Sequence, residues 1–299
     1  MITRRTALQL GAAAAASLAL PARAAKQKLL TRKIPSSGEP LPLVGIGTAR
    51  RFDVSTPEQR EPLMAVLEEL PRLGGKLVDT APSYGVAESV VGELVAKIGN
   101  RKQLFIATKV GAGRNGVEAG VAEMNQSLQR LKSIDLMQIH NLAGVDVMLP
   151  VLRKWKDEKR IRYTGISTSN AKQYEQLEAI MKAEKLDFIQ VDYAIDNRAA
   201  EERILPLALD RGIAVLTNLP FGRGRVLQAF AGKPVPEWAQ GLGIKTWAQF
   251  ALKWVVSHPA VTSAIPGTAK LEYLRDNLGA ARGPLPDPAT RKKMSDLLA

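Results

Sequence analysis

The stretch KLVDTAPSYGVAESVVGE, residues 76–93, predicts a buried strand, a tight turn and an amphipathic helix. The strand covers residues 76–80, the helix begins near Val86, and proline, serine and glycine fill the turn between them. Asp79 stands at the end of the strand, and Tyr84 stands in the turn. Barrel enzymes place their chemistry at the carboxyl ends of buried parallel strands. The stretch therefore predicts one strand–helix unit with two functional side chains at its carboxyl end.

The same alternation of strand and helix repeats along the rest of the chain. Eight short apolar segments are expected to be strands, at residues 43–47, 76–80, 104–110, 134–139, 163–167, 188–192, 213–218 and 261–265. Helices are expected at residues 58–73, 86–98, 116–131, 147–157, 171–184, 199–210, 246–257, 270–279 and 287–298. Residues 26–42 are expected to form a short polar lead, and residues 220–243 a long loop with a short helix.

Eight strand–helix units predict an α/β protein that forms a closed parallel (β/α)8 barrel, or TIM barrel. We expect this barrel to be a single domain over residues 25–299, a length that is ordinary for the fold. The alternative is an open, doubly wound sheet, which would be expected to carry a G-x-G-x-x-G turn after its first strand. No such turn stands there, and Gly222-Arg223-Gly224 follows the seventh expected strand instead.

Residues 1–24 have the three-part pattern of a bacterial export signal. Arg4 and Arg5 form a twin arginine, residues 7–20 are mildly apolar and rich in alanine, and Ala22-Arg23-Ala24 provides a cleavage site. The pattern indicates the twin-arginine (Tat) route, so we expect the Tat export machinery as a partner and the periplasm as the location. The apolar run is shorter than the about 20 residues of a membrane-spanning helix, so no stable membrane insertion is expected after cleavage. The alternative is a cytoplasmic protein with an amphipathic or disordered tail.

Composition narrows the possible functions. The chain has no cysteine, which excludes disulfides, thiol catalysis and zinc–thiolate sites. A net charge of +13 favours anionic partners such as a phosphorylated cofactor, nucleic acid or an anionic lipid surface. The basic residues are scattered and aromatic residues make up only 5%, so no nucleic acid is expected as a partner. The chain has two histidines, far apart in sequence, and no metal site is expected either. We expect a monomer that acts on a small molecule.

Two further strand ends carry ionisable side chains. Lys109 closes the expected strand at residues 104–110, and His140 follows the one at residues 134–139. The carboxyl ends of successive barrel strands meet at one mouth, so these two groups would converge with Asp79 and Tyr84. An ammonium group beside a tyrosine lowers the tyrosine pKa from its usual value of about 10, which would make Tyr84 a proton donor. Each residue alone also has a structural explanation; their occurrence at consecutive strand ends indicates a catalytic site.

These residues resemble the catalytic tetrad of the aldo/keto reductases. The matching motifs are DTAPSYG with Asp79 and Tyr84, ATK with Lys109, and QIH with His140, and their spacing is similar to that family as well. Residues 190–198, 212–224, 265–270 and 274–279 resemble its later segments, so the resemblance covers nearly all of the chain after the signal.

The resemblance implies a barrel that binds NADP(H) at its carboxyl mouth and reduces aldehyde or ketone carbonyls to alcohols. It implies that Tyr84 is the general acid and that Lys109 lowers the pKa of Tyr84. It further implies that Asp79 supports Lys109 and that His140 orients the carbonyl.

The resemblance also implies which residues bind the cofactor. They are Thr48, Asp79, Ser167, Gln190, Leu219, Gly222, Gly267, Lys270 and Asn277. Ser167 and Gln190 would hold the carboxamide, and the backbone that opens the helix after the eighth strand would bind phosphate. Lys270 is the best-placed cation for a 2′-phosphate, so NADP(H) is expected rather than NAD(H). Tyr273 stands where some members of the family have an arginine.

Three positions depart from the family pattern. Thr168 stands after Ser167 where asparagine is frequent, and Asn218 stands where an aromatic ring often stacks on the nicotinamide. Asn141 follows His140, so an aromatic residue that would form a wall of the substrate pocket is absent at this position. We expect these changes to affect cofactor affinity and the substrate pocket, and to leave the proton chemistry intact.

Two other functions are compatible with the pattern. The first is a barrel that keeps the tetrad but acts as a cofactor-binding redox sensor or partner protein with little turnover. The second is an unrelated barrel lyase or isomerase. The rate of hydride transfer separates the enzyme from the sensor, and the absence of an NADPH-induced fluorescence change would favour the lyase or isomerase.

Overall fold

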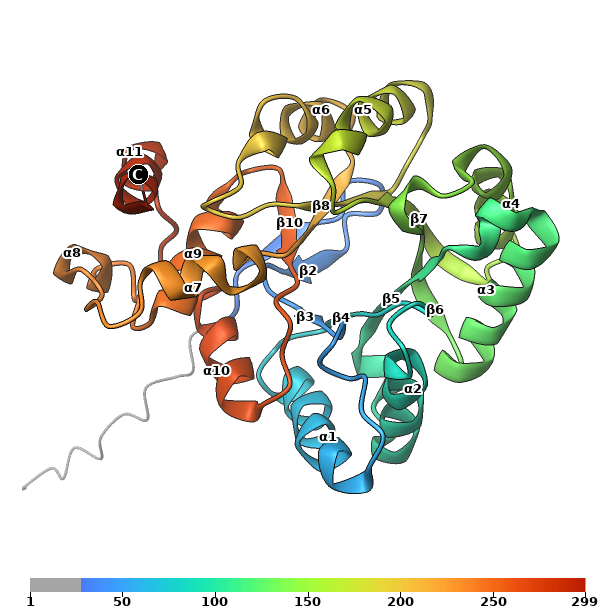
Figure 1. Ribbon diagram of the computed structural model, residues 1–299, viewed down its shortest axis with the longest axis horizontal. Coiled ribbons are helices and arrows are strands. Elements are labelled where there is room, and N and C mark those ends of the chain that lie inside the picture. Colours follow the sequence, from blue (N-terminus) through green and yellow to red (C-terminus); the bar gives the residue numbers. More distant parts are fainter. Residues whose placement is uncertain (1–27, 299) are drawn as a thin grey trace, which may run out of the picture.

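The computed structural model describes residues 28–298, which form a barrel of eight parallel strands surrounded by helices (Figure 1). The strands are β3 (Ile46–Gly47), β4 (Leu77–Asp79), β5 (Phe105–Val110), β6 (Ile134–Ile139), β7 (Ile161–Ser167), β8 (Phe188–Asp192), β9 (Ala214–Asn218) and β10 (Val261–Ala264). They neighbour one another in sequence order. Parallel bridges from Val44 to Ala264 and from Gly47 to Gly267 join the first strand to the last and close the barrel. The predicted (β/α)8 fold is confirmed, and the open doubly wound sheet is excluded.

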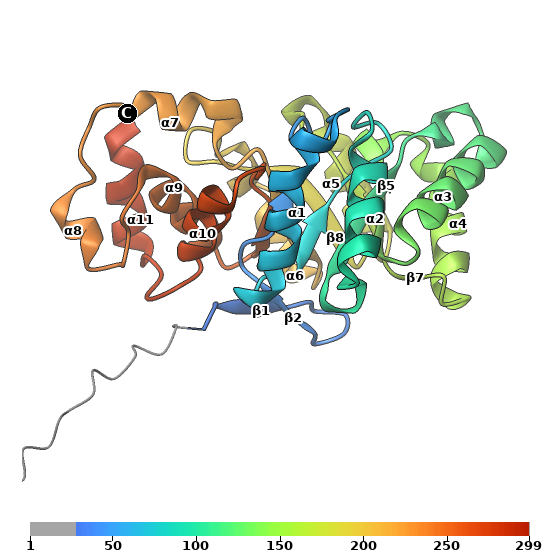
Figure 2. The same cartoon turned by 90° about the horizontal axis from the view of Figure 1, so that it is seen from below.

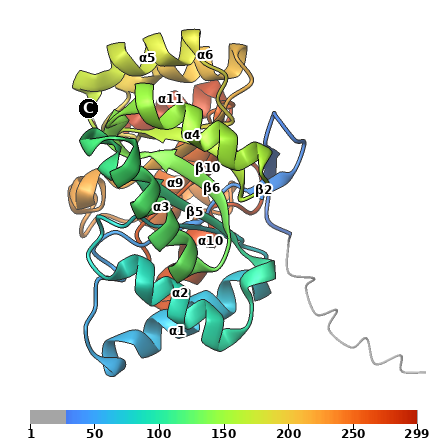
Figure 3. The same cartoon turned by 90° about the vertical axis from the view of Figure 1, so that its right-hand side faces the viewer.

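Helices cover the outside of the barrel, and Figure 3 shows α1 to α6 following one another around it. The helices are α1 (Pro57–Arg72), α2 (Ala87–Ile98), α3 (Val117–Leu131), α4 (Val145–Asp157), α5 (Tyr174–Ala183), α6 (Ile204–Asp210), α7 (Arg225–Ala229), α8 (Glu237–Gln240), α9 (Trp247–Ser257), α10 (Leu271–Gly279) and α11 (Pro288–Ser295). Helix α1 begins with a capping box between Thr56 and Gln59. It ends before Gly74, whose φ of +92° is the left-handed conformation that a non-glycine residue rarely adopts.

Two apolar clusters hold the fold together. The larger cluster lies between the barrel and its helices. The smaller one fills the barrel interior below the mouth, and only Ile265 of it reaches the cavity there: Ile34, Leu41, Leu77, Phe105, Ala107, Leu136, Tyr163, Phe188, Ala214, Leu216 and Ile265. Because side chains fill the interior below the mouth, a ligand can enter the barrel only from the carboxyl end of the strands.

A short hairpin closes the amino end of the barrel. It consists of β1 (Thr31–Lys33) and β2 (Pro40–Pro42), which pair antiparallel, and we call it the floor hairpin. Ile34 and Leu41 are fully buried, and the hydroxyl of Tyr163 donates to Glu39 of the hairpin at 2.8 Å. Figure 2 shows the hairpin on the opposite side of the barrel from α7. The expectation of a plain polar lead over residues 26–42 is therefore wrong, because two buried side chains give this segment a structural role.

Residues 220–243 contain more regular structure than the sequence predicts. The expected long loop at residues 220–243 contains a 3-10 turn, Gly222–Gly224, and two short helices, α7 and α8, rather than one. The expected export signal at residues 1–24 lies outside the described residues. Within residues 28–298, no helix has the length and apolar character that crossing a membrane requires.

Candidate active site

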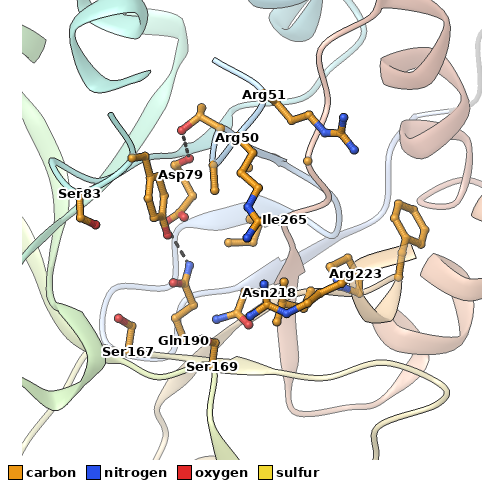
Figure 4. Close-up of a pocket in the computed structure, with 18 of the residues that line it drawn as sticks. Arg50, Arg51, Asp79, Ser83, Ser167, Ser169, Gln190, Asn218, Arg223 and Ile265 are labelled. Atoms are coloured by element: carbon orange, nitrogen blue, oxygen red, sulfur yellow. Dashed lines mark hydrogen bonds between the residues drawn. The ribbon is translucent and has the colours of Figure 1, made fainter. Parts of the chain in front are cut away.

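The carboxyl ends of the strands surround a cavity of about 780 Å³ (Figure 4). This volume lies within the range of small-molecule and cofactor sites, roughly 300–1,000 Å³. Loops that follow β3, β4, β6, β7, β9 and β10 supply its wall. The polar lining includes Thr48, Arg50, Arg51, Asp79, Ser83, Tyr84, His140, Asn141, Ser167, Thr168, Gln190, Asn218 and Arg223. The cavity therefore offers a polar, partly cationic site at the mouth of the barrel.

Asp79 and Lys109 form a buried ion pair beneath the cavity. They stand at the carboxyl ends of β4 and β5, and the Lys109 Nζ lies 2.6 Å from the Asp79 Oδ1. The ammonium also donates to the carbonyl oxygen of Thr80 at 2.9 Å. Burial opposes the charge on Lys109, but the neighbouring Asp79 carboxylate and Tyr84 outweigh burial and raise the Lys109 pKa. Lys109 therefore keeps its positive charge although it is only 1% exposed.

Tyr84 lies beside this ion pair, in the turn between β4 and α2. The Lys109 Nζ is 4.8 Å from the centre of the Tyr84 ring. Tyr84 is half-buried and lines the cavity, so its side chain is accessible to a ligand there. An ammonium at this distance stabilises the phenolate that remains after a tyrosine gives up its proton.

His140 completes the group at the end of β6. Its ring meets the Tyr84 ring edge to face, with 5.8 Å between the ring centres. Burial, Lys109 and Arg114 lower the His140 pKa to about 4, so the imidazole is neutral at pH 7. The Oγ of Ser83 lies 3.2 Å from the His140 Nδ1. The structure thus brings together all four residues that the sequence predicts for the chemistry.

The Asp79 carboxylate is held by two glutamines as well as by Lys109. Its Oδ2 accepts hydrogen bonds from the Nε2 of Gln190 at 3.0 Å and from the Nε2 of Gln138 at 3.3 Å. Sequence reasoning expected Gln190 at a cofactor carboxamide and overlooked Gln138. Gln138 is fully buried in β6, opposite Lys109 in the register of β5 and β6. A glutamine within the otherwise apolar residues 136–139, two positions before His140, is the signal that identifies it.

The residues expected to bind a cofactor fall into two groups. Thr48, Asp79, Ser167, Gln190, Leu219 and Gly267 line the cavity. Gly222, Lys270 and Asn277 do not line it. Gly222 is buried between two lining residues, Phe221 and Arg223. Lys270 is the exposed residue before α10, and Asn277 is buried in α10, where its amide donates to the Thr268 hydroxyl at 3.1 Å.

The three positions that depart from the family pattern are linked by hydrogen bonds. The Nδ2 of Asn218 donates to the carbonyl oxygen of Thr168 at 3.1 Å. The Thr168 hydroxyl donates to Gln173 at 2.6 Å, and the Gln173 amide donates to the carbonyl oxygen of Asn141 at 3.1 Å. The Oδ1 of Asn218 is buried without a donor among the described residues. We call these four residues the polar wall: Asn141, Thr168, Gln173 and Asn218. At Asn218 the family pattern often has an aromatic ring that stacks on the nicotinamide.

Three arginines in the cavity wall escaped the sequence-based prediction. Arg50 and Arg51 come from the loop after β3, and Arg223 comes from the turn after β9 (Figure 4). Within residues 28–298, none of the three forms an ion pair. The arginine pair in GTARR, separated from Thr48 by one alanine, was the sequence feature that could have identified two of them. Unpaired guanidinium groups around a cavity favour phosphate or carboxylate ligands. The described residues contain no cluster of acidic or histidine side chains that could hold a metal ion.

Comparisons with known proteins agree with this geometry. A sequence model of the aldo/keto reductase family matches residues 43–292. The NADP(+) aldo-keto reductase yakc of Schizosaccharomyces pombe is 24% identical, and the match covers 88% of this chain and 89% of that one. An uncharacterized oxidoreductase of the same yeast, C215.11c, is 31% identical over 75% of this chain and 76% of its own. The crystal structure of an aldo/keto reductase from Klebsiella pneumoniae, in complex with NADP and acetate, superposes with a TM-score of 0.74 at 25% identity. That match covers 91% of this chain and 95% of the other.

Proposed function

The chain belongs to the aldo/keto reductase family, and from this premise we propose that it reduces aldehyde or ketone carbonyls to alcohols with NADP(H) as cofactor. The observation that carries the proposal is the meeting of Tyr84 and His140 above the buried Lys109–Asp79 pair. A proton donor, a hydrogen-bond donor and a fixed cation at one cavity wall are suited to a developing alkoxide.

The cavity fits the proposed cofactor. Its volume of about 780 Å³ and its unpaired arginines match a large, multiply phosphorylated ligand. The buried Oδ1 of Asn218, which lacks a donor among the described residues, matches the amide hydrogens of a carboxamide. Thr48, Ser167, Gln190, Leu219 and Gly267 would hold the cofactor along the wall. When bound, NADPH supplies a hydride to the carbonyl carbon of the substrate.

The side chains of the protein would supply the proton and the orientation. The neutral His140 donates a hydrogen bond to the carbonyl oxygen and fixes its place beside Tyr84. As the carbonyl carbon gains the hydride, the C=O π electrons move to oxygen, and Tyr84 gives its hydroxyl proton to that oxygen. The Lys109 ammonium stabilises the phenolate until solvent returns a proton to it. Asp79, held by Gln138 and Gln190, keeps Lys109 charged and in place.

NADP(H) is proposed over NAD(H) because positive charge surrounds the entrance. The Arg51 side chain lies against Gly267, just after β10. It is so close that a Cβ atom at position 267 would lie 3.3 Å from the Arg51 Cγ. Lys270 stands directly before α10, where a helix amino terminus also favours an anion. Lys270 and Arg51 are the candidates for the 2′-phosphate.

The test of the proposal is the variant Tyr84→Phe, measured by stopped-flow hydride transfer with NADPH and an aldehyde panel. Loss of the general acid should reduce kcat by about 10²- to 10⁴-fold, because proton transfer would no longer accompany hydride transfer. NADPH affinity should hold, because the ring remains in place. Tyr163→Phe is the matched control. It removes a tyrosine hydroxyl beside the floor hairpin, far from the cavity, and should leave kcat unchanged.

Two results would contradict the proposal. If Tyr84→Phe kept more than about a third of the wild-type kcat, Tyr84 would not be the general acid. If the wild type bound NADPH but transferred hydride very slowly to every aldehyde and ketone tested, a redox sensor or partner protein would replace the enzyme. The polar wall is the observation that favours this second function, because Asn218 stands where an aromatic ring often stacks on the nicotinamide.

We further propose that the protein is exported through the Tat route as a monomer and works in the periplasm. The support is the twin arginine at Arg4 and Arg5, followed by an alanine-rich run and a cleavage site. The Tat route carries folded proteins, so a barrel that needs a cytoplasmic cofactor would cross the membrane with it bound. Cell fractionation of the variant with both arginines changed to lysine tests this; normal export of that variant would exclude the route.

A further inference from the structure

We propose that Ser83 is a positioning residue for the carbonyl reduction proposed above: its hydroxyl fixes which nitrogen of His140 carries the proton. The Ser83 Oγ lies 3.2 Å from the His140 Nδ1, and both residues line the cavity. Ser83 directly precedes Tyr84, so one turn would hold both the proton donor, Tyr84, and the hydroxyl that sets the tautomer of His140.

The need for such a group follows from the chemistry of imidazole. A neutral imidazole has one nitrogen that donates and one that accepts, so a donor bound at one nitrogen leaves the proton on the other. If Ser83 donates to Nδ1, the proton of His140 lies on Nε2, which can then donate to a carbonyl oxygen. In the opposite arrangement Nε2 presents a lone pair, which would repel the lone pairs of a carbonyl oxygen and of the alkoxide that follows.

The surroundings of His140 favour donation by Ser83. The charged groups that act on the ring, Lys109 and Arg114, are both cations and cannot accept a proton from Nδ1. The Tyr84 and His140 rings stand at 84° to one another, and within the described residues no hydrogen bond joins Tyr84 to the imidazole. Within the described part of the chain, the Ser83 hydroxyl has no hydrogen-bond partner other than Nδ1, so its proton is available for this bond.

The chain contains an internal reference for the measurement. It has two histidines, and the second, His258, accepts a hydrogen bond at Nδ1 from the backbone N–H of Ala260 at 3.2 Å. A backbone N–H can only donate, so the proton of neutral His258 must lie on Nε2. A nitrogen–proton correlation spectrum of protein labelled with nitrogen-15 histidine therefore shows two imidazoles, one of known tautomer. The variant His140→Gln assigns them.

The experiment compares the wild type, Ser83→Ala and Ser83→Thr as full chains with NADPH bound at neutral pH. We expect the Nε2–H pattern for both histidines of the wild type. In Ser83→Ala the signal of His140 should move toward a mixture of tautomers, while that of His258 stays fixed. With p-nitrobenzaldehyde as probe, kcat/KM should fall about three- to tenfold, the value of one hydrogen bond, without a change in NADPH affinity. Ser83→Thr keeps the hydroxyl and should restore both.

Three outcomes would overturn the inference. The first is a wild-type spectrum with the His140 proton on Nδ1. The second is a Ser83→Ala variant whose tautomer and kcat/KM both equal those of the wild type. The third is a loss of rate with an unchanged tautomer, because Ser83 would then act in some other way. A wild type that reduces no carbonyl compound would instead contradict the proposed function, and the spectrum would still decide the tautomer.

Discussion

Among residues 28–298, two lysines are buried, and their surroundings differ. Lys109, at the mouth, is 1% exposed and lies 2.6 Å from the Asp79 carboxylate. Lys253, in α9, is fully buried and donates to the backbone carbonyl oxygens of Arg282 at 2.5 Å and Pro284 at 3.1 Å. Within residues 28–298 no carboxylate lies in ion-pair contact with Lys253. One ammonium is thus paired with a charge, and the other only with dipoles.

The difference appears in the pKa values of the two groups. Burial alone lowers the pKa of Lys253 from 10.5 to about 8. Burial also acts on Lys109, but Asp79 and Tyr84 more than compensate and raise its pKa above 10.5. Backbone carbonyls therefore satisfy hydrogen bonds without compensating for the desolvation of a charge, whereas a carboxylate does both. A permanent cation suits chemistry at the mouth, while Lys253 serves to attach the segment between α10 and α11 to α9.

The largest effect is expected when Lys109 loses its charge. In Lys109→Met, kcat should fall by at least about 100-fold, because the Tyr84 phenolate loses its stabilising cation. The free energy of unfolding should fall by about 3–5 kcal/mol, because the Asp79 carboxylate stays buried without its partner. Stopped-flow hydride transfer and urea unfolding measure the two effects.

The double variant Lys109→Met with Asp79→Asn is the matched control. It removes both charges, so most of the stability should return while kcat stays low. If Lys109→Met lost no more than about 1 kcal/mol, the pair would behave as an exposed salt bridge, and the contrast with Lys253 would disappear.

A smaller effect is expected when Lys253 becomes methionine. Lys253→Met keeps the apolar stem but leaves two carbonyl oxygens without a donor, so unfolding should cost about 1–3 kcal/mol less. The value of kcat should equal that of the wild type, because α9 supplies no residue to the cavity wall. The exposed Lys245, just before α9, gives the control Lys245→Met, which should change stability by less than about 0.5 kcal/mol. A loss of kcat in Lys253→Met would show that the segment is coupled to the mouth.

The two lysines should also differ in the pH dependence of their contributions to stability. Folded Lys253 releases its proton near pH 8 and unfolded lysine near 10.5, so between these values the unfolded state binds more protons. Wild-type stability relative to Lys253→Met should therefore rise between about pH 8 and 10.5. The pKa of Lys109 is raised instead, so its contribution is complete below 10.5 and is lost only at higher pH. Urea unfolding of the wild type and both Met variants at two alkaline pH values measures this. Parallel pH dependence of the two variants would contradict the comparison.

The sequence allowed the tetrad to be predicted because the topology places strand ends together. Asp79, Lys109 and His140 stand at the carboxyl ends of three consecutive buried strands, and a closed barrel brings these ends together at one mouth. Gln138 was harder to find, because only the register of β5 and β6 places it opposite Lys109 and near Asp79. Its type and position were visible in the sequence, but its partner was not.

Other features depend on contacts between distant segments. Asn218, Thr168 and Asn141 were each identified as departures. Asn218 donates directly to Thr168, but the link from Thr168 to Asn141 runs through Gln173, which belongs to no motif. The floor hairpin was missed because its strands have three residues each, and the buried Leu41 and Pro42 are adjacent rather than alternating. Strands this short do not establish an alternating pattern, so periodicity could not reveal them.

The floor hairpin also bears on the order of folding. It is the first described segment to leave the ribosome, yet Ile34 and Leu41 pack among side chains that reach as far along the chain as Leu216 and Ile265. The hydrogen bond from the Tyr163 hydroxyl to Ser37 joins residues that are 126 positions apart in the sequence. Contacts of such long range form late, because the intervening chain must be ordered before they stabilise anything. The residues that are synthesised first among those described therefore close the amino end of the barrel last. The floor hairpin can dock only after synthesis and closure of the sheet are complete.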